Sequence, residues 1–334
     1  APGAQWILIL FAYASIASFL PIWMLLQPRA YINGIQLFVG LILVYATVFI
    51  AAPPIVAPAF NMALPANTPD LLPLLFVTVG CGAVSGFHGL VGSGTTSKQI
   101  NLETDERFVC YLGSAGEGAL ALAAIIAVSA GFASLDEWRG VYTEFGNGGI
   151  TAFVQGGATI VSSGSGLRHE TAATLLTMMA VLFAGTTMDT GVRLQRYIVQ
   201  EWGDIYGIRL FRNPHIATAV AVGACLTLAF AAGGPDLTGG MALWPLFGTT
   251  NQLLAGLTLL VISVILVKQR RPIKYTLIPM AFVTTVALLA AIYQLDDLYE
   301  KGQFLLLGVD IVIVISAVCV LLEASSALKR NLRI

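Results

Sequence analysis

Nine long apolar runs occupy most of this 334-residue chain and constrain its fold more than any other feature. A helix of about 20 predominantly apolar residues crosses a bilayer core about 30 Å thick. Runs of this kind lie at 6–26, 35–52, 71–92, 108–131, 170–190, 216–232, 241–267, 275–292 and 304–322. Only 10% of the residues are charged, against about 25% in a soluble domain. The sequence therefore predicts an all-α, polytopic membrane helical bundle of about nine transmembrane helices.

Lysine and arginine are unevenly distributed among the segments that connect these runs. Cytoplasmic segments of membrane proteins carry an excess of both residues. If the C-terminus is cytoplasmic, 14 of the 17 Lys and Arg fall on that side, and Arg139, Arg168 and Lys301 fall outside. The same alternation places the N-terminus outside. An outside start without a signal peptide is explained if an N-terminal portion with an odd number of spans is missing.

Two predicted outer segments are long. Residues 53–70 contain five prolines and cannot form a regular helix. Residues 132–169 begin polar and end in Ile150–Gly166, which is rich in Gly, Ser and Ala and is too short and too polar to span. We interpret 132–169 as an extracytoplasmic segment with a possible re-entrant element, within a single transmembrane domain over 1–334.

The predicted span 71–92 loses its regular helical pattern in the glycine-rich sequence from Ser85 to Gln99. Non-helical backbone at membrane depth is tolerated only inside protein or beside a wet cavity, and transporters place substrate and ion sites at such breaks. The polar residues of this stretch are candidates for a substrate or ion pathway: Ser85, His88, Ser93, Thr95, Thr96, Ser97 and Lys98. The histidine is either a satisfied hydrogen-bonding group or a proton relay. No Lys-Ser/Thr follows the G-x-x-x-x-G spacing, so nucleotide binding is not predicted.

Glu117 is the only acidic residue of the run 108–131. About nine residues into a helix it would lie about 13 Å deep, where a carboxylate costs several kcal/mol unless it is paired, neutralised or hydrated. Gly113, Ala121 and Ala124 share its predicted face and favour close helix packing. We therefore expect Glu117 to face protein, either as a proton carrier or as a structural carboxyl bonded to a neighbouring helix.

Asp189 and Arg193 lie four residues apart at the end of the run 170–190, which predicts a structural pair on one helix face. Together with the hydroxyl of Thr187, they form either an ion pair at the inner membrane surface or part of an inner gate or ion site.

Asn251 and Gln252 belong to the run 241–267. Pro245 suits the first turn of a helix, which would place the two amides in the second turn. Such amides usually bond to another helix, and a contribution to the substrate or ion pathway is the alternative. Asp310 is the remaining acid within a run, and the sequence does not name its partner.

Other functional classes lack a pattern. The basic residues are scattered and form no phosphate-binding stripe, so no nucleic-acid partner is expected. The four cysteines form no C-x-x-C pair, the three histidines lie far apart, and no nucleophile–base set is recognisable. We therefore expect neither enzymatic activity nor a metal or cofactor.

Five stretches of this sequence resemble the carbon starvation protein A family of bacterial inner-membrane carriers. They are Leu20–Arg29, Gly82–His88, Ser93–Gln99 (SGTTSKQ) with Glu103 and Asp105, Thr187–Arg193 and Trp244–Leu254. Gly92 and Ala30 stand where the family usually has Ser and Asp. Family members are much longer, and their N-terminal portion carries its own glycine-rich segment. The resemblance implies a missing N-terminal portion and part of an inverted-repeat transporter of the LeuT-like, amino acid–polyamine–organocation type.

The resemblance further implies a secondary active transporter of the inner membrane that couples protons to uptake of pyruvate or small peptides during carbon starvation. The alternative is a starvation sensor or structural membrane subunit that keeps the fold without transporting. Part of the substrate site would lie in the missing portion, so we expect the 334 residues alone to lack full transport.

The topology is testable by cysteine labelling. We expect the segments 93–107 and 192–215 to face the cytoplasm, because they carry six of the 14 inner basic residues. Cysteines placed at Gln99 and Arg209 should resist a membrane-impermeant reagent in intact cells, whereas one at Arg139 should react. Ready labelling at both inner positions would disprove this topology.

Overall fold

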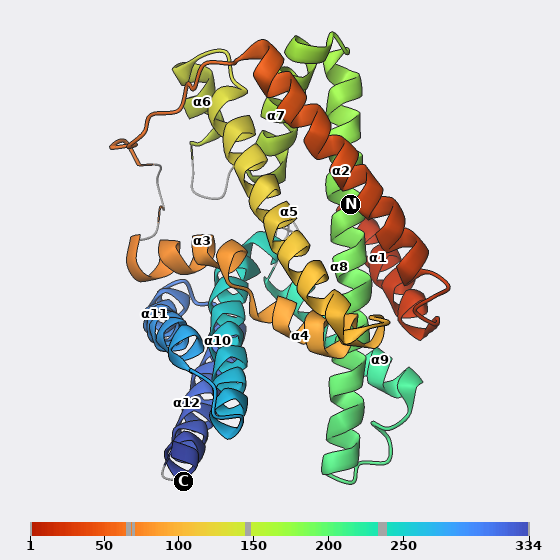
Figure 1. Ribbon diagram of the computed structural model, residues 1–334, viewed down its shortest axis with the longest axis vertical. Coiled ribbons are helices and arrows are strands. Elements are labelled where there is room, and N and C mark those ends of the chain that lie inside the picture. Colours follow the sequence, from red (N-terminus) through yellow and green to blue (C-terminus); the bar gives the residue numbers. More distant parts are fainter. Residues whose placement is uncertain (1, 65–67, 69–70, 144–147, 233–238, 333–334) are drawn as a thin grey trace. The chain divides into compact units, whose positions relative to one another are not determined.

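The computed structural model describes residues 2–64, 68, 71–143, 148–232 and 239–332, and all regular structure in these ranges is helical. The chain divides into two compact units (Figure 1). The first, which we call the α10 unit, contains Ala1–Leu8, Pro69–Lys98 and Val220–Ile334. The second, the α8 unit, contains Ile9–Thr68 and Gln99–Ala219.

Eight helical stretches of the described chain are long and apolar enough to cross a membrane, which confirms the polytopic helical bundle. They are Leu26–Ala51, Leu71–Lys98, Glu103–Ala130, His169–Ile205, Pro214–Ala231, Leu243–Lys268, Lys274–Glu300 and Phe304–Leu322. The ninth predicted run, 6–26, corresponds to the shorter helix α1 (Pro2–Phe19), because the chain turns at 20–25 before α2 (Leu26–Ala51) begins.

The α8 unit is built around α7 (Gly149–Ser165), which contacts α2, α5 (Glu103–Ala130) and α8 (His169–Ile205). Its apolar core includes Leu41, Val44, Ala123, Ala158, Val161, Ala172, Leu176 and Met179. The proline-rich residues 52–64 are not helical, as predicted, and the short helix α6 (Leu135–Val141) begins at Ser134, whose hydroxyl accepts from Glu137 N–H.

Glycines explain why α7 can lie between three helices. A Cβ on Gly156 would stand 2.1 Å from the carbonyl oxygen of Ala127 on α5, and a Cβ on Gly164 would stand 2.7 Å from Thr47 on α2. Helices approach this closely only where the side chain is a hydrogen atom. The Gly/Ser/Ala composition of 150–166 therefore reflects tight packing, and a re-entrant path for this segment stays a prediction.

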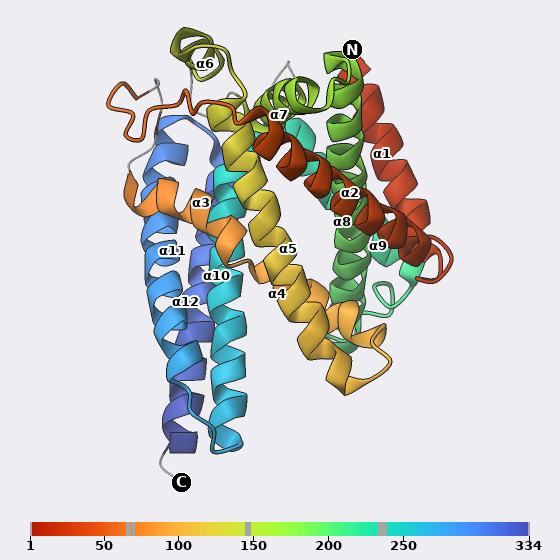
Figure 2. The same cartoon turned by 45° about the horizontal axis from the view of Figure 1, so that its top comes forward.

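The α10 unit contains three long helices that run side by side: α10 (Gly239–Lys268), α11 (Lys274–Glu300) and α12 (Phe304–Leu332) (Figure 2). Against them pack the single-turn η1 (Leu71–Leu75), α3 (Phe76–Ala83) and α4 (Gly86–Gly94). The 3₁₀ turn η2 (Thr96–Lys98) follows α4. Helix α9 (Pro214–Ala232) completes the described helices.

The predicted helix interruption is present but shorter than expected. Val84 (φ −136°, ψ 104°) and Ser85 (φ −115°, ψ 123°) are extended, and α4 resumes the helix at Gly86. The glycine-rich residues 86–94 are therefore helical rather than irregular. The reason is packing, because Gly86 and Gly89 lie directly against α10, where a side chain would not fit.

The prediction that Pro245 opens its helix is wrong, because α10 begins at Gly239 and contains this proline. The helix continues across the one backbone hydrogen bond that proline cannot donate. Asn251 and Gln252 therefore lie well inside α10 rather than in its second turn.

Two glycines of α4 provide a matched test of this packing. A Cβ on Gly86 would stand 2.5 Å from the backbone of Asn251 and Ala255, whereas a Cβ on Gly92 would meet nothing within 4 Å. Gly86→Ala should lower the free energy of unfolding in mixed micelles by about 1–3 kcal/mol. Gly92→Ala should leave it unchanged or raise it by up to about 1 kcal/mol. Equal effects of the two substitutions would contradict the described contact.

Candidate functional site

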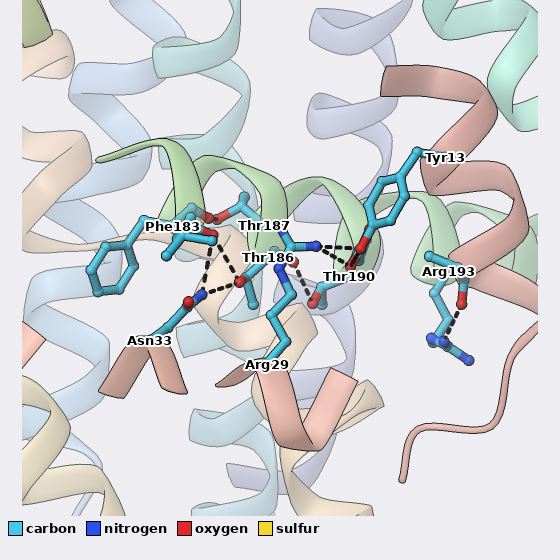
Figure 3. A network of polar contacts seen from close by, with 11 residues as sticks. Tyr13, Arg29, Asn33, Phe183, Thr186, Thr187, Thr190 and Arg193 are labelled. Carbon is cyan, nitrogen blue, oxygen red and sulfur yellow. Dashed lines mark hydrogen bonds and ion pairs between the residues drawn. The ribbon is translucent and has the colours of Figure 1, made fainter. Parts of the chain in front are cut away.

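A buried ion pair joins α2 to α8 within the α8 unit. Arg29 Nη1 lies 2.7 Å from Asp189 Oδ2, and the Asp189 side chain is only 2% exposed. The same Nη1 donates to the hydroxyl of Tyr13 at 2.6 Å, and this hydroxyl donates to Asp189 Oδ2 at 3.3 Å. Figure 3 shows the side chains of Tyr13 from α1 and Arg29 from α2 meeting beside α8. We call this group the Asp189 cluster.

The sequence of α8 makes room for this arginine. A Cβ on Gly185 would stand 1.9 Å from Arg29 Nη2, so any side chain at this position, one turn before Asp189, would displace the guanidinium. Nearby, Asn33 on α2 donates to the carbonyl oxygen of Leu182 at 3.1 Å and to the hydroxyl of Thr186. Polar contacts therefore fasten α2 to α8 over two successive turns (Figure 3).

Arg193 is not the ion-pair partner of Asp189, so the predicted structural pair is wrong in its partner. Its Nη2 instead donates to the carbonyl oxygen of Ala17 at 2.8 Å, and Arg196 Nη1 donates to that of Ser18 at 2.6 Å. Both carbonyls belong to the last turn of α1, where they lack intrahelical donors and carry partial negative charge. The four-residue spacing correctly predicted that Arg193 and Asp189 lie near each other. It did not predict that the carbonyl oxygens of α1 would compete for the guanidinium.

The hydroxyls near Asp189 are used within their own helix. Thr187 donates to the carbonyl oxygen of Phe183 at 3.1 Å, and Thr190 donates to that of Thr186 at 3.1 Å. Asp189 Oδ1 has no hydrogen-bond partner. The Asp189 cluster is thus a cation–anion pair with a buried carboxylate, one oxygen of which can still accept a proton or a hydrogen bond.

The second polar site is the helix break, which α10 holds with two buried amides in the α10 unit. Asn251 Oδ1 accepts from Phe87 N–H at 2.7 Å, and its Nδ2 lies 2.8 Å from Cys81 Sγ and 3.1 Å from Ser85 Oγ. Gln252 Nε2 donates to the carbonyl oxygen of Val84 at 2.9 Å. We call this arrangement the amide clamp.

The amide clamp replaces hydrogen bonds that the interruption removes from the backbone. Val84 can no longer offer its carbonyl to a helical donor, and Phe87 N–H lies in the first turn of α4 without an intrahelical acceptor. Asn251 and Gln252 satisfy both groups, which is the helix-bonding role that the sequence favoured. Their place in a substrate pathway stays a prediction.

The other glycine-rich candidates lie along α4 and η2. Ser93 donates to the carbonyl oxygen of Gly89 at 2.9 Å, and Ser97 donates to that of Ser93 at 2.7 Å. Thr95 is buried, Thr96 is half-buried, and His88 and Lys98 are exposed. The structure therefore brings Ser85 together with Asn251, whereas the hydroxyls of Ser93 and Ser97 bond to backbone carbonyls one turn earlier in the chain.

Glu117 is exposed on α5 and does not lie on the face that packs within the α8 unit, so the expectation that it faces neighbouring protein stays a prediction. The packed face of α5 carries Ala119, Leu120 and Ala123, and Glu117 lies about 120° around the helix from Ala123. Small residues surround Glu117 in sequence, but the helix uses a different set of small residues for packing. Its role as a proton carrier stays a prediction.

Tyr13, Arg29 and Asn33 take part in the site, although sequence reasoning selects none of them. A signal existed for Arg29, because it follows Pro28 where an apolar helix begins and belongs to a stretch that carries the family resemblance. Within the described ranges, no three His, Cys, Asp or Glu side chains come together as a metal site would require.

Comparison with known proteins gives consistent matches. The sequence profile described as "Carbon starvation protein CstA" matches residues 2–139 and 140–290. The chain is 31% identical to the peptide transporter CstA of Campylobacter jejuni, over 89% of this chain and 49% of that protein. It is 32% identical to the peptide transporter CstA of Mycobacterium tuberculosis, over 82% and 43%. It is 27% identical to the pyruvate/proton symporter BtsT of Escherichia coli, over 78% and 46%. The chain therefore spans about half the length of these relatives, and no solved structure matches.

The Asp189 cluster predicts an unequal response of two acids to the same substitution. Asp189→Asn leaves the half-buried Arg29 without its anion and should cost about 3–5 kcal/mol of unfolding free energy. Asp297→Asn removes an exposed pair with Lys301 (2.7 Å) and should cost about 0–1 kcal/mol. Chemical unfolding in mixed micelles measures both, and similar losses would contradict the burial of the Arg29–Asp189 pair.

Proposed function

This chain belongs to the carbon starvation protein CstA family, and we propose that it acts in a proton-coupled secondary transporter for pyruvate or small peptides. The relatives supply the substrate classes, because they are named peptide transporters and a pyruvate/proton symporter. These relatives are about twice as long as this chain. The transport activity is therefore proposed for a whole protein that contains these 334 residues.

The helix break is the observation that carries the proposal. An interruption in a membrane-spanning stretch exposes backbone groups that lipid cannot satisfy, and transporters use such interruptions near their substrate and ion sites. In this chain Val84 and Ser85 interrupt a stretch that is otherwise long enough to span. Two amides of a neighbouring helix hold the interruption in place.

The Asp189 cluster suits a gate that responds to charge. Pyruvate and peptides both carry a carboxylate, and a guanidinium binds a carboxylate in a planar, two-point geometry. Arg29 is 18% exposed and is held by Asp189 through one nitrogen. A substrate carboxylate or a proton on Asp189 would weaken this pair and loosen α2 from α8, which is how the cluster would gate transport.

The alternative is a starvation sensor or structural subunit that does not transport. One observation favours it: the polar groups at the break are already bonded to Asn251 and Gln252, so the clamp by itself is a stable support. We place the protein in the bacterial inner membrane as a multi-pass protein, with the N-terminus of this chain outside and its C-terminus in the cytoplasm.

Uptake into vesicles separates these functions. In vesicles that contain the native protein, labelled pyruvate or a labelled dipeptide should accumulate above its external concentration only under an inward proton gradient, because coupling supplies the work. A protonophore should abolish the accumulation, and vesicles without the protein are the control. Failure of the folded protein to take up or exchange either substrate would favour the non-transporting alternative.

A further inference from the structure

The three long helices of the α10 unit enclose two apolar clusters, one above the other along the bundle. The members of the first cluster are Leu246, Leu298 and Leu306, and those of the second are Leu253, Ala287 and Ala317. Each cluster takes one residue from α10, one from α11 and one from α12. The two clusters therefore fix which levels of the three helices face one another.

On each helix a buried polar residue lies, in sequence, between the members of the two clusters: Thr249 on α10, Gln294 on α11 and Asp310 on α12. Each stands three or four residues from the leucine that its helix gives to the first cluster, and residues at this spacing share a helix face. All three are buried, with exposed fractions of 1%, 3% and 0%. We call this level of the bundle the Asp310 layer.

The Asp310 layer contains hydrogen-bond acceptors that lack donors. Both carboxyl oxygens of Asp310 and Oε1 of Gln294 are buried without a hydrogen-bond partner. The Thr249 hydroxyl donates to the carbonyl oxygen of Pro245 at 3.1 Å, which commits its proton and leaves its lone pairs available. Burying a carboxylate without a partner costs more free energy than packing at this position returns, so a purely structural role does not explain Asp310.

The described residues around the layer do not supply the missing positive charge. Lys301 is engaged by Asp297 at 2.7 Å, and Lys268 and Lys274 lie at the other ends of α10 and α11. Among the described side chains, the other titratable groups of α9, α11 and α12 are exposed or half-buried: His215 and Cys225 on α9, Tyr275, Tyr293, Asp296, Tyr299 and Glu300 on α11, and Cys319 on α12.

We infer that the Asp310 layer binds the cation that drives transport. The shared chemistry is one positive charge among buried oxygens. A proton would add to one Asp310 oxygen, and the new O–H group would donate to Gln294 Oε1. A sodium ion would instead lie among the carboxylate, amide and hydroxyl oxygens. This inference rests on the proposed function, because a driving cation has meaning only in a transporter.

Helix α10 links this layer to the helix break within the same unit. Thr249 lies two and three residues before Asn251 and Gln252, which form the amide clamp on Val84 and Phe87. Binding of a cation would neutralise the layer and tighten α12 against α10. Because one turn of α10 carries both sites, the same shift would reach the clamp.

Infrared difference spectroscopy on the purified native protein tests the site without a transport assay. Stepping the pH in sodium-free buffer should reveal a protonated carboxyl band that is lost in Asp310→Asn. Adding sodium at constant pH should instead change the carboxylate bands if sodium is the ligand. Asp297→Asn, which alters an exposed acid of α11 three residues from Gln294, should retain the wild-type spectrum. Absence of any Asp310-dependent change with either cation would overturn the inference.

The transport assay then tests coupling. Asp310→Asn supplies an amide donor to the layer, so the variant should fold, exchange labelled substrate and lose gradient-driven accumulation. Wild-type accumulation in this variant would overturn the coupling role. If the variant does not fold, Gln294→Leu should shift the Asp310 band or the sodium response, and an unchanged spectrum would count against the layer. Binding signals without any uptake by the wild type would instead refute the proposed function.

Discussion

Backbone hydrogen bonds are the constraint on which the α10 unit depends. A stretch buried in an apolar surrounding must satisfy every N–H and C=O group, and the extended residues Val84 and Ser85 break that pattern. Asn251 and Gln252 restore it from α10. This requirement explains the neighbouring glycine, because an amide reaches the backbone of the break only if Gly86 lets the two helices touch.

In the α8 unit, charged side chains rather than amides satisfy buried polar groups. Arg193 and Arg196 end α1 by donating to its last carbonyls, and Arg29 and Asp189 join α2 to α8. Replacing such a pair by apolar residues is often neutral or stabilising, so its presence is weak evidence for stability. A buried pair does respond to a change of charge at either partner. The Asp189 cluster is therefore better suited to switching than to support.

Sequence reasoning finds the features that one helix determines by itself. The apolar runs, the proline-rich link and the interruption before α4 are all readable from local composition. The partners of a side chain are not readable in this way. Arg193 is four residues from Asp189 but bonds to α1, and Glu117 has small neighbours that the helix does not use for packing. The spacing of two residues along one helix predicts that their side chains lie near each other. Which hydrogen-bond acceptor a side chain uses, and which face of the helix is packed, depend on the neighbouring helices.

Whether a buried polar side chain already has hydrogen-bond partners indicates whether it supports the fold or is available to bind a ligand. Asn251 and Gln252 are buried and bonded to the break, so a ligand would have to displace existing bonds to use them. Asp310 is equally buried, yet neither of its oxygens has a partner. A group that is costly to bury and remains unpaired is the one that gains most from a ligand. Helix α10 touches both kinds of site, and it can therefore convert occupancy of the Asp310 layer into a change at the break.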